Sequence, residues 1–142
     1  MNSKNIIFIN RVALFIVYAW FGFLKIIGHS PAEELVQSLA RITLEPYISS
    51  DFFVYLLGYF ECTLGILWLF PKFTKLAFWI LAFHLGTTFL PMIFMADQIW
   101  QELLTPSLVG QYIIKNIVLL ASAMTIYGSV KEEDVSYVFK TA

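Results

Sequence analysis

The sequence predicts an all-α membrane protein, a single domain over residues 1–142 in which four transmembrane helices run up, down, up and down. Of its 142 residues, 59% are hydrophobic and 13% are charged, with a mean hydropathy of +0.76. A soluble domain carries about 25% charged residues. Four apolar runs approach the ~20 residues that a helix needs to cross a bilayer core: about 6–27, 52–70, 74–95 and 109–128.

The loops between the predicted spans indicate their orientation. The connection Pro71–Phe73 is so short that the second and third spans must be antiparallel neighbours. On the side of the membrane opposite the Pro71–Phe73 connection, the loops carry Arg41, and Lys25 lies at the membrane border. Cytoplasmic loops carry an excess of lysine and arginine, so the sequence predicts both termini in the cytoplasm. Five lysines support this orientation: Lys4, Lys72, Lys75, Lys131 and Lys140.

The two outer loops are predicted to contain short amphipathic helices. Ser30–Glu33 combines a serine cap, a proline at the first helical position and a glutamate three residues after the cap. Apolar residues then recur at helical spacing from Leu35 to Ile42. A second short helix is predicted near Ala96–Leu104. The two helices could form a lid, or could simply close the loops against lipid head groups, which is the more common arrangement.

Glu61 is the most informative residue, because it lies near the middle of the second span. A charged side chain at the bilayer centre costs about 3 kcal/mol or more. The sequence therefore predicts that Glu61 is protonated, paired or facing a polar cavity. Gly58 and Gly65 lie three residues before it and four after it, on the same helix face. This spacing indicates that a neighbouring helix approaches the carboxylate closely.

Each of the other spans also carries a polar stripe, which predicts a bundle with a polar interior. Lys25 and Lys115 both come near the outer border and have stems long enough to reach Glu61, so either or both could pair with it. A Lys–Glu–Lys arrangement would be positive and could hold an anion. The candidate ligand-binding residues are Lys25, Glu61, His84, Lys115, Asn116, Arg11 and Tyr18.

Structural interpretations stand beside these functional ones. Lys25 could snorkel to lipid head groups, Arg11 could reach the inner leaflet or pair structurally, and His84 could make a helix–helix hydrogen bond. With only His29 besides His84, no metal site is predicted. The single cysteine, Cys62, excludes an internal disulfide. No catalytic set of nucleophile, base and orienting group is apparent, and no basic patch favours nucleic acid.

Two stretches resemble the DoxX-like family of four-span membrane proteins. The first comprises Arg11, Trp20–Lys25, and Gly58–Glu61 with Gly65. The second is similar to the YkgB-like branch, which includes a protein linked to reactive-chlorine resistance. It runs from Thr88–Leu90 through Trp100 and Pro106 to Gly110–Asn116. The resemblance covers about residues 8–128, although Asn116 stands where much of the branch has an aspartate.

This resemblance implies a four-helix bundle in a bacterial inner membrane, associated with redox or oxidative-stress systems. It implies no established reaction. Arg11, Gly22, Lys25, Glu61, Gly65, Lys115 and Asn116 match the positions regarded as signatures of the family.

Three functions remain open from the sequence. The first is a redox-linked protein whose pocket, open toward the outer face, binds a quinone or a small anionic or polar ligand. Because the chain has no prosthetic-group signature, a partner protein would supply the electrons. The second is a non-enzymatic accessory subunit or assembly factor, and the third a small-solute transporter. Expected partners are the lipid bilayer, a redox protein and further copies of the chain.

Overall fold

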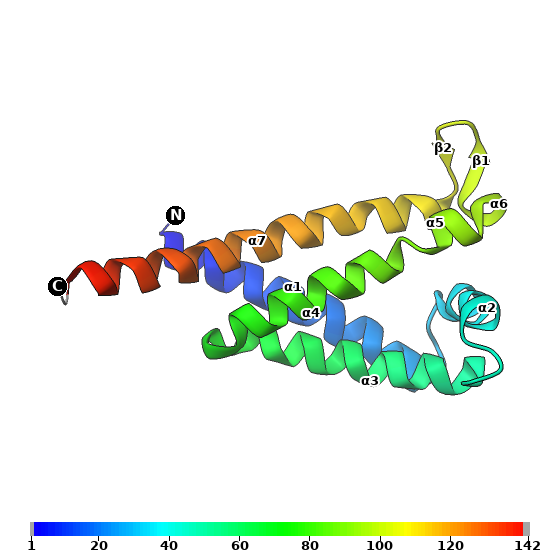
Figure 1. Cartoon of the computed structure of the whole chain (residues 1–142), viewed down its shortest axis with the longest axis horizontal. Coiled ribbons are helices and arrows are strands. Elements are labelled where there is room, and N and C mark those ends of the chain that lie inside the picture. Colours follow the sequence, from blue (N-terminus) through cyan, green and yellow to red (C-terminus); the bar gives the residue numbers. More distant parts are fainter. Residues whose placement is uncertain (1, 141–142) are drawn as a thin grey trace.

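The computed structural model of the chain describes the backbone of residues 2–140 and the side chains of residues 2–130. Four segments are long and apolar enough to cross a membrane, and they form the bundle in Figure 1. The predicted all-α, four-helix membrane fold is confirmed. The membrane-length segments are α1 (Ser3–Ile26), α3 (Ser50–Leu69), η1 with α4 and α5 (Pro71–Phe94), and α7 (Leu108–Lys140), of which Leu108–Val130 is the apolar part.

The second and third spans form the expected antiparallel pair. The turn η1 (Pro71–Phe73) joins α3 directly to α4 (Thr74–Thr88). Both termini lie at the η1 end of the bundle, and the longer loops lie at the other end (Figure 1). Lys131 and Lys140, which contributed to the predicted orientation, lie outside the described side chains.

The third span is interrupted, whereas the sequence predicted one helix over 74–95. Helix α4 ends at Thr88, and α5 (Pro91–Phe94) begins three residues later. Proline has no N–H to continue the helical hydrogen bonds, and it disfavours helical geometry in the residue before it. The Thr87 hydroxyl donates to the carbonyl of His84 at 2.7 Å, and the Thr88 hydroxyl to that of Leu85 at 2.8 Å. These bonds occupy carbonyl groups in the last turn of α4.

Helix α2 (Glu33–Thr43) confirms the amphipathic helix predicted in the first outer loop. The predicted helix start is wrong, because α2 begins at Glu33 rather than at Pro31 and Ser30 is not its cap. The Ser30 hydroxyl instead accepts a hydrogen bond from the Ala32 N–H at 3.3 Å. The Gln37 side chain donates to the Asp51 carboxylate at 2.9 Å. This bond ties α2 to the first turn of α3.

The helix predicted over Ala96–Leu104 is largely wrong. Only α6 (Ala96–Ile99) is helical, and a small hairpin follows it, formed by β1 (Trp100–Glu102) and β2 (Thr105–Pro106). Leu104, in the turn, has a φ of 62°, which a continuing right-handed helix cannot contain. Ser107 closes the loop, because its N–H donates to the carbonyl of Ile99 at 2.8 Å.

Close packing and polar contacts hold the four helices together. Helices α1 and α3 make the tightest contact, through glycines on both helices. The Ser122 hydroxyl of α7 donates to the Asn10 side chain of α1 at 2.6 Å. The apolar core lies between the helices, toward the η1 end. Its buried members are Leu14, Tyr18, Leu64, Trp68, Ala77, Leu81, Leu85, Ala123 and Ile126.

Candidate functional site

Glu61 lies in a cluster of three ionisable side chains from three helices. Lys25 Nζ of α1 donates a hydrogen bond to Glu61 Oε2 at 2.6 Å. His84 Nε2 of α4 lies 3.5 Å from Glu61 Oε1. The residues are only 5% exposed at Lys25 and His84 and 6% at Glu61. The prediction that Glu61 is paired with a lysine is therefore confirmed, with Lys25 as the partner.

The glycine contact between α1 and α3 positions this pair. A Cβ atom at Gly58 would lie 2.8 Å from the Gly22 carbonyl oxygen and 3.0 Å from the Cβ of Lys25. The lysine stem therefore leaves α1 directly beside Gly58. Side chains on a helix lean toward its N-terminus, which directs the stem along α3 toward Glu61, one turn after Gly58. The prediction that Gly58 and Gly65 allow a neighbouring helix to approach closely is confirmed.

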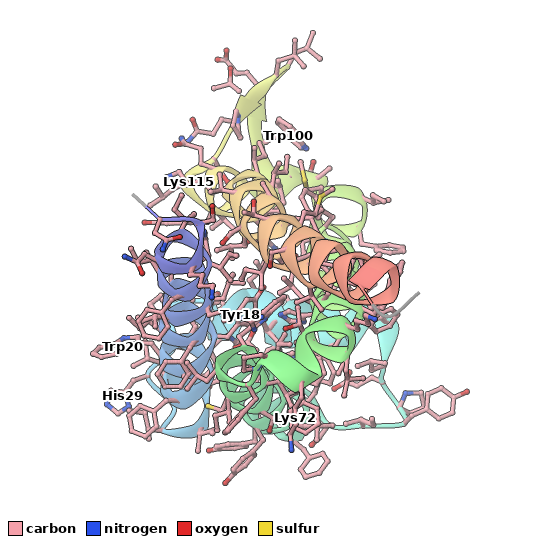
Figure 2. The ribbon with its side chains drawn as sticks, turned by 90° about the vertical axis from the view of Figure 1, so that its left-hand side faces the viewer. Tyr18, Trp20, His29, Lys72, Trp100 and Lys115 are labelled. Carbon is pink, nitrogen blue, oxygen red and sulfur yellow. The ribbon has the colours of Figure 1, made fainter. Side chains whose placement is uncertain are left out.

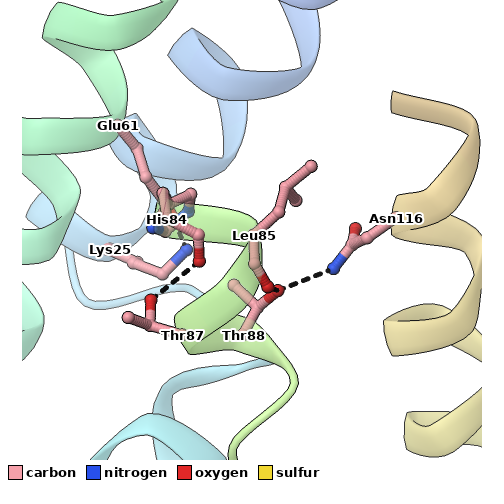
Figure 3. A network of polar contacts seen from close by, with 7 residues as sticks. All are labelled: Lys25, Glu61, His84, Leu85, Thr87, Thr88 and Asn116. Carbon is pink, nitrogen blue, oxygen red and sulfur yellow. Dashed lines mark hydrogen bonds and ion pairs between the residues drawn. The ribbon is translucent and has the colours of Figure 1, made fainter. Parts of the chain in front are cut away.

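Two aromatic rings flank the imidazole of His84. The Tyr18 ring meets it edge-on, with centroids 5.8 Å apart, and the Phe60 ring lies tilted at 5.3 Å. On the next turn of α4, Thr88 accepts a hydrogen bond from the Asn116 amide of α7 at 3.2 Å. This contact extends the polar region from α4 to the fourth span (Figure 3).

A cavity of about 690 Å³ adjoins the cluster. Ligand pockets in proteins measure about 300–1,000 Å³, so this volume suits a small organic molecule. Helix α2 lies along one side of the cavity, and α3, α4, α5 and α7 contribute the others. Its polar lining is Lys25, Thr43, Glu61, His84, Thr87, Thr88, Tyr112 and Asn116, and its apolar lining is Ala32, Leu35, Val36, Leu39, Ala40, Leu44, Phe53, Leu56, Leu57, Phe60, Phe83, Leu90, Pro91 and Ile113.

Four of the seven predicted site residues line this cavity: Lys25, Glu61, His84 and Asn116. Tyr18 is buried behind His84 and points into the bundle (Figure 2). It touches the cluster without lining the cavity.

Lys115 does not reach Glu61, so the Lys–Glu–Lys arrangement that the sequence allowed does not form. Its side chain is exposed, and its Nζ lies 5.0 Å from the centroid of the Tyr112 ring (Figure 2). Adjacent residues of a helix point about 100° apart, so Asn116 lines the cavity while Lys115 lies on the surface.

Arg11 belongs to a different part of the molecule. Its guanidinium donates to the Trp68 carbonyl at 3.0 Å and to the Thr74 hydroxyl at 2.7 Å. These two acceptors lie at the end of α3 and the start of α4, beside η1. Arg11 is buried and joins α1 to the η1 turn, as the structural interpretation of the sequence had it.

The sequence did not indicate the apolar walls of the cavity. Five of these apolar wall residues lie on or directly before α2. The spacing of its apolar residues could have indicated that this helix covers another surface. Phe53, Leu57 and Phe60 of α3 follow a helical repeat on a face different from that of the glycines. In a span where most residues are apolar, such a face cannot be distinguished from one that contacts lipid.

Within the described residues, no group of three His, Cys, Asp or Glu side chains is placed to hold a metal ion. Searches against protein-family models, curated proteins and solved structures give no match. The candidate site therefore rests on geometry: a buried ion pair, an imidazole and a mainly apolar cavity.

Proposed function

We propose that this multi-pass membrane protein binds a quinone-type head group in the cavity beside Lys25, Glu61 and His84. One observation carries the proposal: a buried cluster of hydrogen-bonding groups borders an otherwise mainly apolar cavity of about 690 Å³. Small-molecule sites typically combine apolar walls with a few convergent polar groups. A ring that carries carbonyl oxygens and an apolar substituent matches both features.

Lys25 is the group best suited to a ligand carbonyl. An ammonium group has three donors, and among the described residues Lys25 makes a hydrogen bond to Glu61 alone. The remaining donors can serve an oxygen atom in the cavity. Glu61 can accept a hydrogen bond or a proton from a hydroxyl group of the ligand. Phe60 and Phe83 would supply apolar contacts to a ring.

The resemblance to DoxX-like proteins supports a redox setting for this site. In that setting the protein lies in a bacterial inner membrane with both termini in the cytoplasm and cooperates with a redox partner protein. The partner supplies or removes electrons, and the cavity holds the ligand. Further copies of the chain could surround the site as a homo-oligomer.

The proposal is tested by purifying the protein in a mild detergent, extracting the bound lipids and measuring quinones by mass spectrometry. Quinone enrichment over the membrane extract is expected for the native chain and should disappear in Lys25→Met. Lys115→Met is the matched control, because it removes a lysine that is exposed and outside the cavity. Quinone levels in a folded Lys25→Met variant equal to those of the native protein would contradict the proposal.

A second candidate is a non-enzymatic accessory subunit or assembly factor. The specific observation in its favour is that Lys25 of α1 and Glu61 of α3 form a buried ion pair at 2.6 Å. A buried polar pair of this kind can fix how two helices align. Under this hypothesis the native chain carries no quinone, and a partner complex fails to assemble when the pair is broken.

A further inference from the structure

The cavity reaches the lipid-facing surface of the bundle. Three of its lining residues, Leu56 and Phe60 of α3 and Phe83 of α4, are 48%, 36% and 75% exposed. All three lie inside the membrane-spanning segments. In a bilayer, such exposed apolar side chains contact the hydrocarbon chains of lipids. The wall formed by α3 and α4 therefore separates the cavity from lipid incompletely.

Helix α2 lies over the end of the cavity opposite the termini. Leu35, Val36, Leu39 and Ala40 of α2 line the cavity, and Ala40 is only 1% exposed. The bond from Gln37 to Asp51 holds α2 against the start of α3. Figure 1 shows α2 at the end of the bundle opposite the termini, beside α3. The helix thus lies over this end of the cavity.

The charges around the cavity balance each other. Lys25 is the one lysine or arginine among its lining residues, and its charge is compensated by Glu61 at 2.6 Å. The formal charges of this pair sum to zero. An anionic head group would need an unpaired cation, because burying a charge without a partner is costly. The site favours a head group that is polar but uncharged.

We infer that the ligand is a long-tailed, membrane-dissolved lipid with an uncharged polar head group, which enters the cavity sideways from the bilayer between α3 and α4. This inference rests on the proposed function, since it specifies the ligand class and the access path of the same site. The head group lies at Lys25 and Glu61, and the tail leaves past Phe60 and Phe83 into the lipid. Helix α2 keeps water from the head group.

The access path is tested by spin labelling in proteoliposomes, with Cys62 replaced by serine. Leu57→Cys places a nitroxide on the cavity wall, and Phe53→Cys provides a second wall position if the first variant does not fold. Oxygen dissolves in lipid, whereas a nickel chelate stays in water. We expect oxygen to dominate the relaxation of a label at Leu57. At Glu34, an exposed residue of α2, the nickel chelate should dominate. Equal nickel accessibility at the two positions would overturn access from the bilayer.

The ligand class is tested by adding two probes with the same tail, a decyl-substituted benzoquinone and decyl sulfate, to these proteoliposomes. The quinone should reduce oxygen collisions at the Leu57 label at a mole fraction about tenfold below that of the sulfate, a clearly measurable difference in affinity. Equal or tighter binding of decyl sulfate would overturn the uncharged head group alone. If neither probe acts, the proposed function fails together with the ligand class.

A pair of α4 variants tests the position of the tail. Phe83→Ala should weaken binding of the decyl benzoquinone several-fold, because Phe83 borders the cavity at the lipid surface. Trp79→Ala is the matched control, since Trp79 is similarly exposed, at 65%, one turn earlier on α4, and does not line the cavity. Equal effects of the two substitutions would overturn the path between α3 and α4.

Discussion

Gly22 of α1 and Gly58 of α3 face each other backbone to backbone. A Cβ at Gly22 would lie 2.6 Å from the Gly58 carbonyl oxygen, and a Cβ at Gly58 would lie 2.8 Å from that of Gly22. Contacts this close exclude any side chain. They bring α1 near enough to α3 for the Lys25 side chain to reach Glu61. The candidate site therefore depends on two residues that have no functional groups.

The first prediction concerns this contact. Gly58→Ala should destabilise the protein by about 1–3 kcal/mol, because the added methyl group overpacks the α1–α3 contact. The measurement is thermal unfolding in detergent, followed by circular dichroism. Gly86→Ala is the control, since Gly86 is exposed on α4 and a Cβ there meets nothing within 4 Å. Similar melting temperatures for the two variants would contradict the proposed role of Gly58.

A second prediction concerns the ion pair. Glu61→Gln leaves Lys25 buried without its charged partner, and breaking a buried pair from one side typically costs about 3–5 kcal/mol. The double variant Lys25→Met, Glu61→Gln should be less destabilised than the sum of the single variants. Denaturation of all four proteins in the same detergent gives the coupling energy.

The control for this double-mutant cycle combines Lys115→Met with Glu61→Gln. The Lys115 side chain is exposed and contacts the Tyr112 ring, so its effect should simply add to that of Glu61→Gln. Additive behaviour of Lys25 together with coupling of Lys115 would show that the wrong lysine has been assigned to Glu61.

Arg11 provides a third prediction, about the η1 end of the bundle. Arg11→Met removes two hydrogen bonds, to the Trp68 carbonyl and the Thr74 hydroxyl. Leaving buried acceptors without donors costs about 1–3 kcal/mol each, so the melting temperature should fall clearly. Arg11→Lys should recover only part of the loss, because an ammonium lacks the two-pronged geometry of guanidinium. Full recovery with lysine would mean that charge alone matters. Lys4→Met, at an exposed position, is expected to have little effect.

The fourth prediction concerns orientation. In a Cys62→Ser background, Glu34→Cys and Gln101→Cys should react with a membrane-impermeant maleimide in intact cells, because both lie in the loops predicted to face outward. Lys72→Cys, in the η1 turn, should react only after the cells are permeabilised. All three residues are exposed, so accessibility does not separate them. Labelling of Lys72→Cys alone in intact cells would reverse the predicted topology.

The sequence indicated the existence of the site better than its composition. Glu61 attracts attention because a carboxylate in an apolar span must find a partner, and that requirement holds whatever the fold. Its partner could not be chosen from spacing. Lys25 and Lys115 both lie near the ends of their spans opposite the termini, and only the packing of α1 against α3 brings Lys25 to the carboxylate.

Two secondary-structure predictions were wrong for the same reason. The apolar run over 74–95 predicted one helix, but Thr87, Thr88 and Pro91 end α4 early. The segment 96–104 has apolar residues at helical spacing, yet its second half pairs with 105–106 as a hairpin. A short segment adopts the structure that its neighbours stabilise, so spacing alone is a weak guide there.

What the sequence determined by itself is the membrane fold: four apolar runs of spanning length, an antiparallel second and third pair, an amphipathic α2, and a glutamate that needs a partner. These follow from hydrophobicity, chain length and the cost of buried charge, which act on each segment separately. The tertiary structure decided which lysine pairs with Glu61 and that Arg11 hydrogen-bonds the residues on either side of η1. It also decided that α2 lies over a cavity bordered by α3, α4 and α7. Those features depend on distances between helices, and close packing sets these distances only when all the helices are assembled.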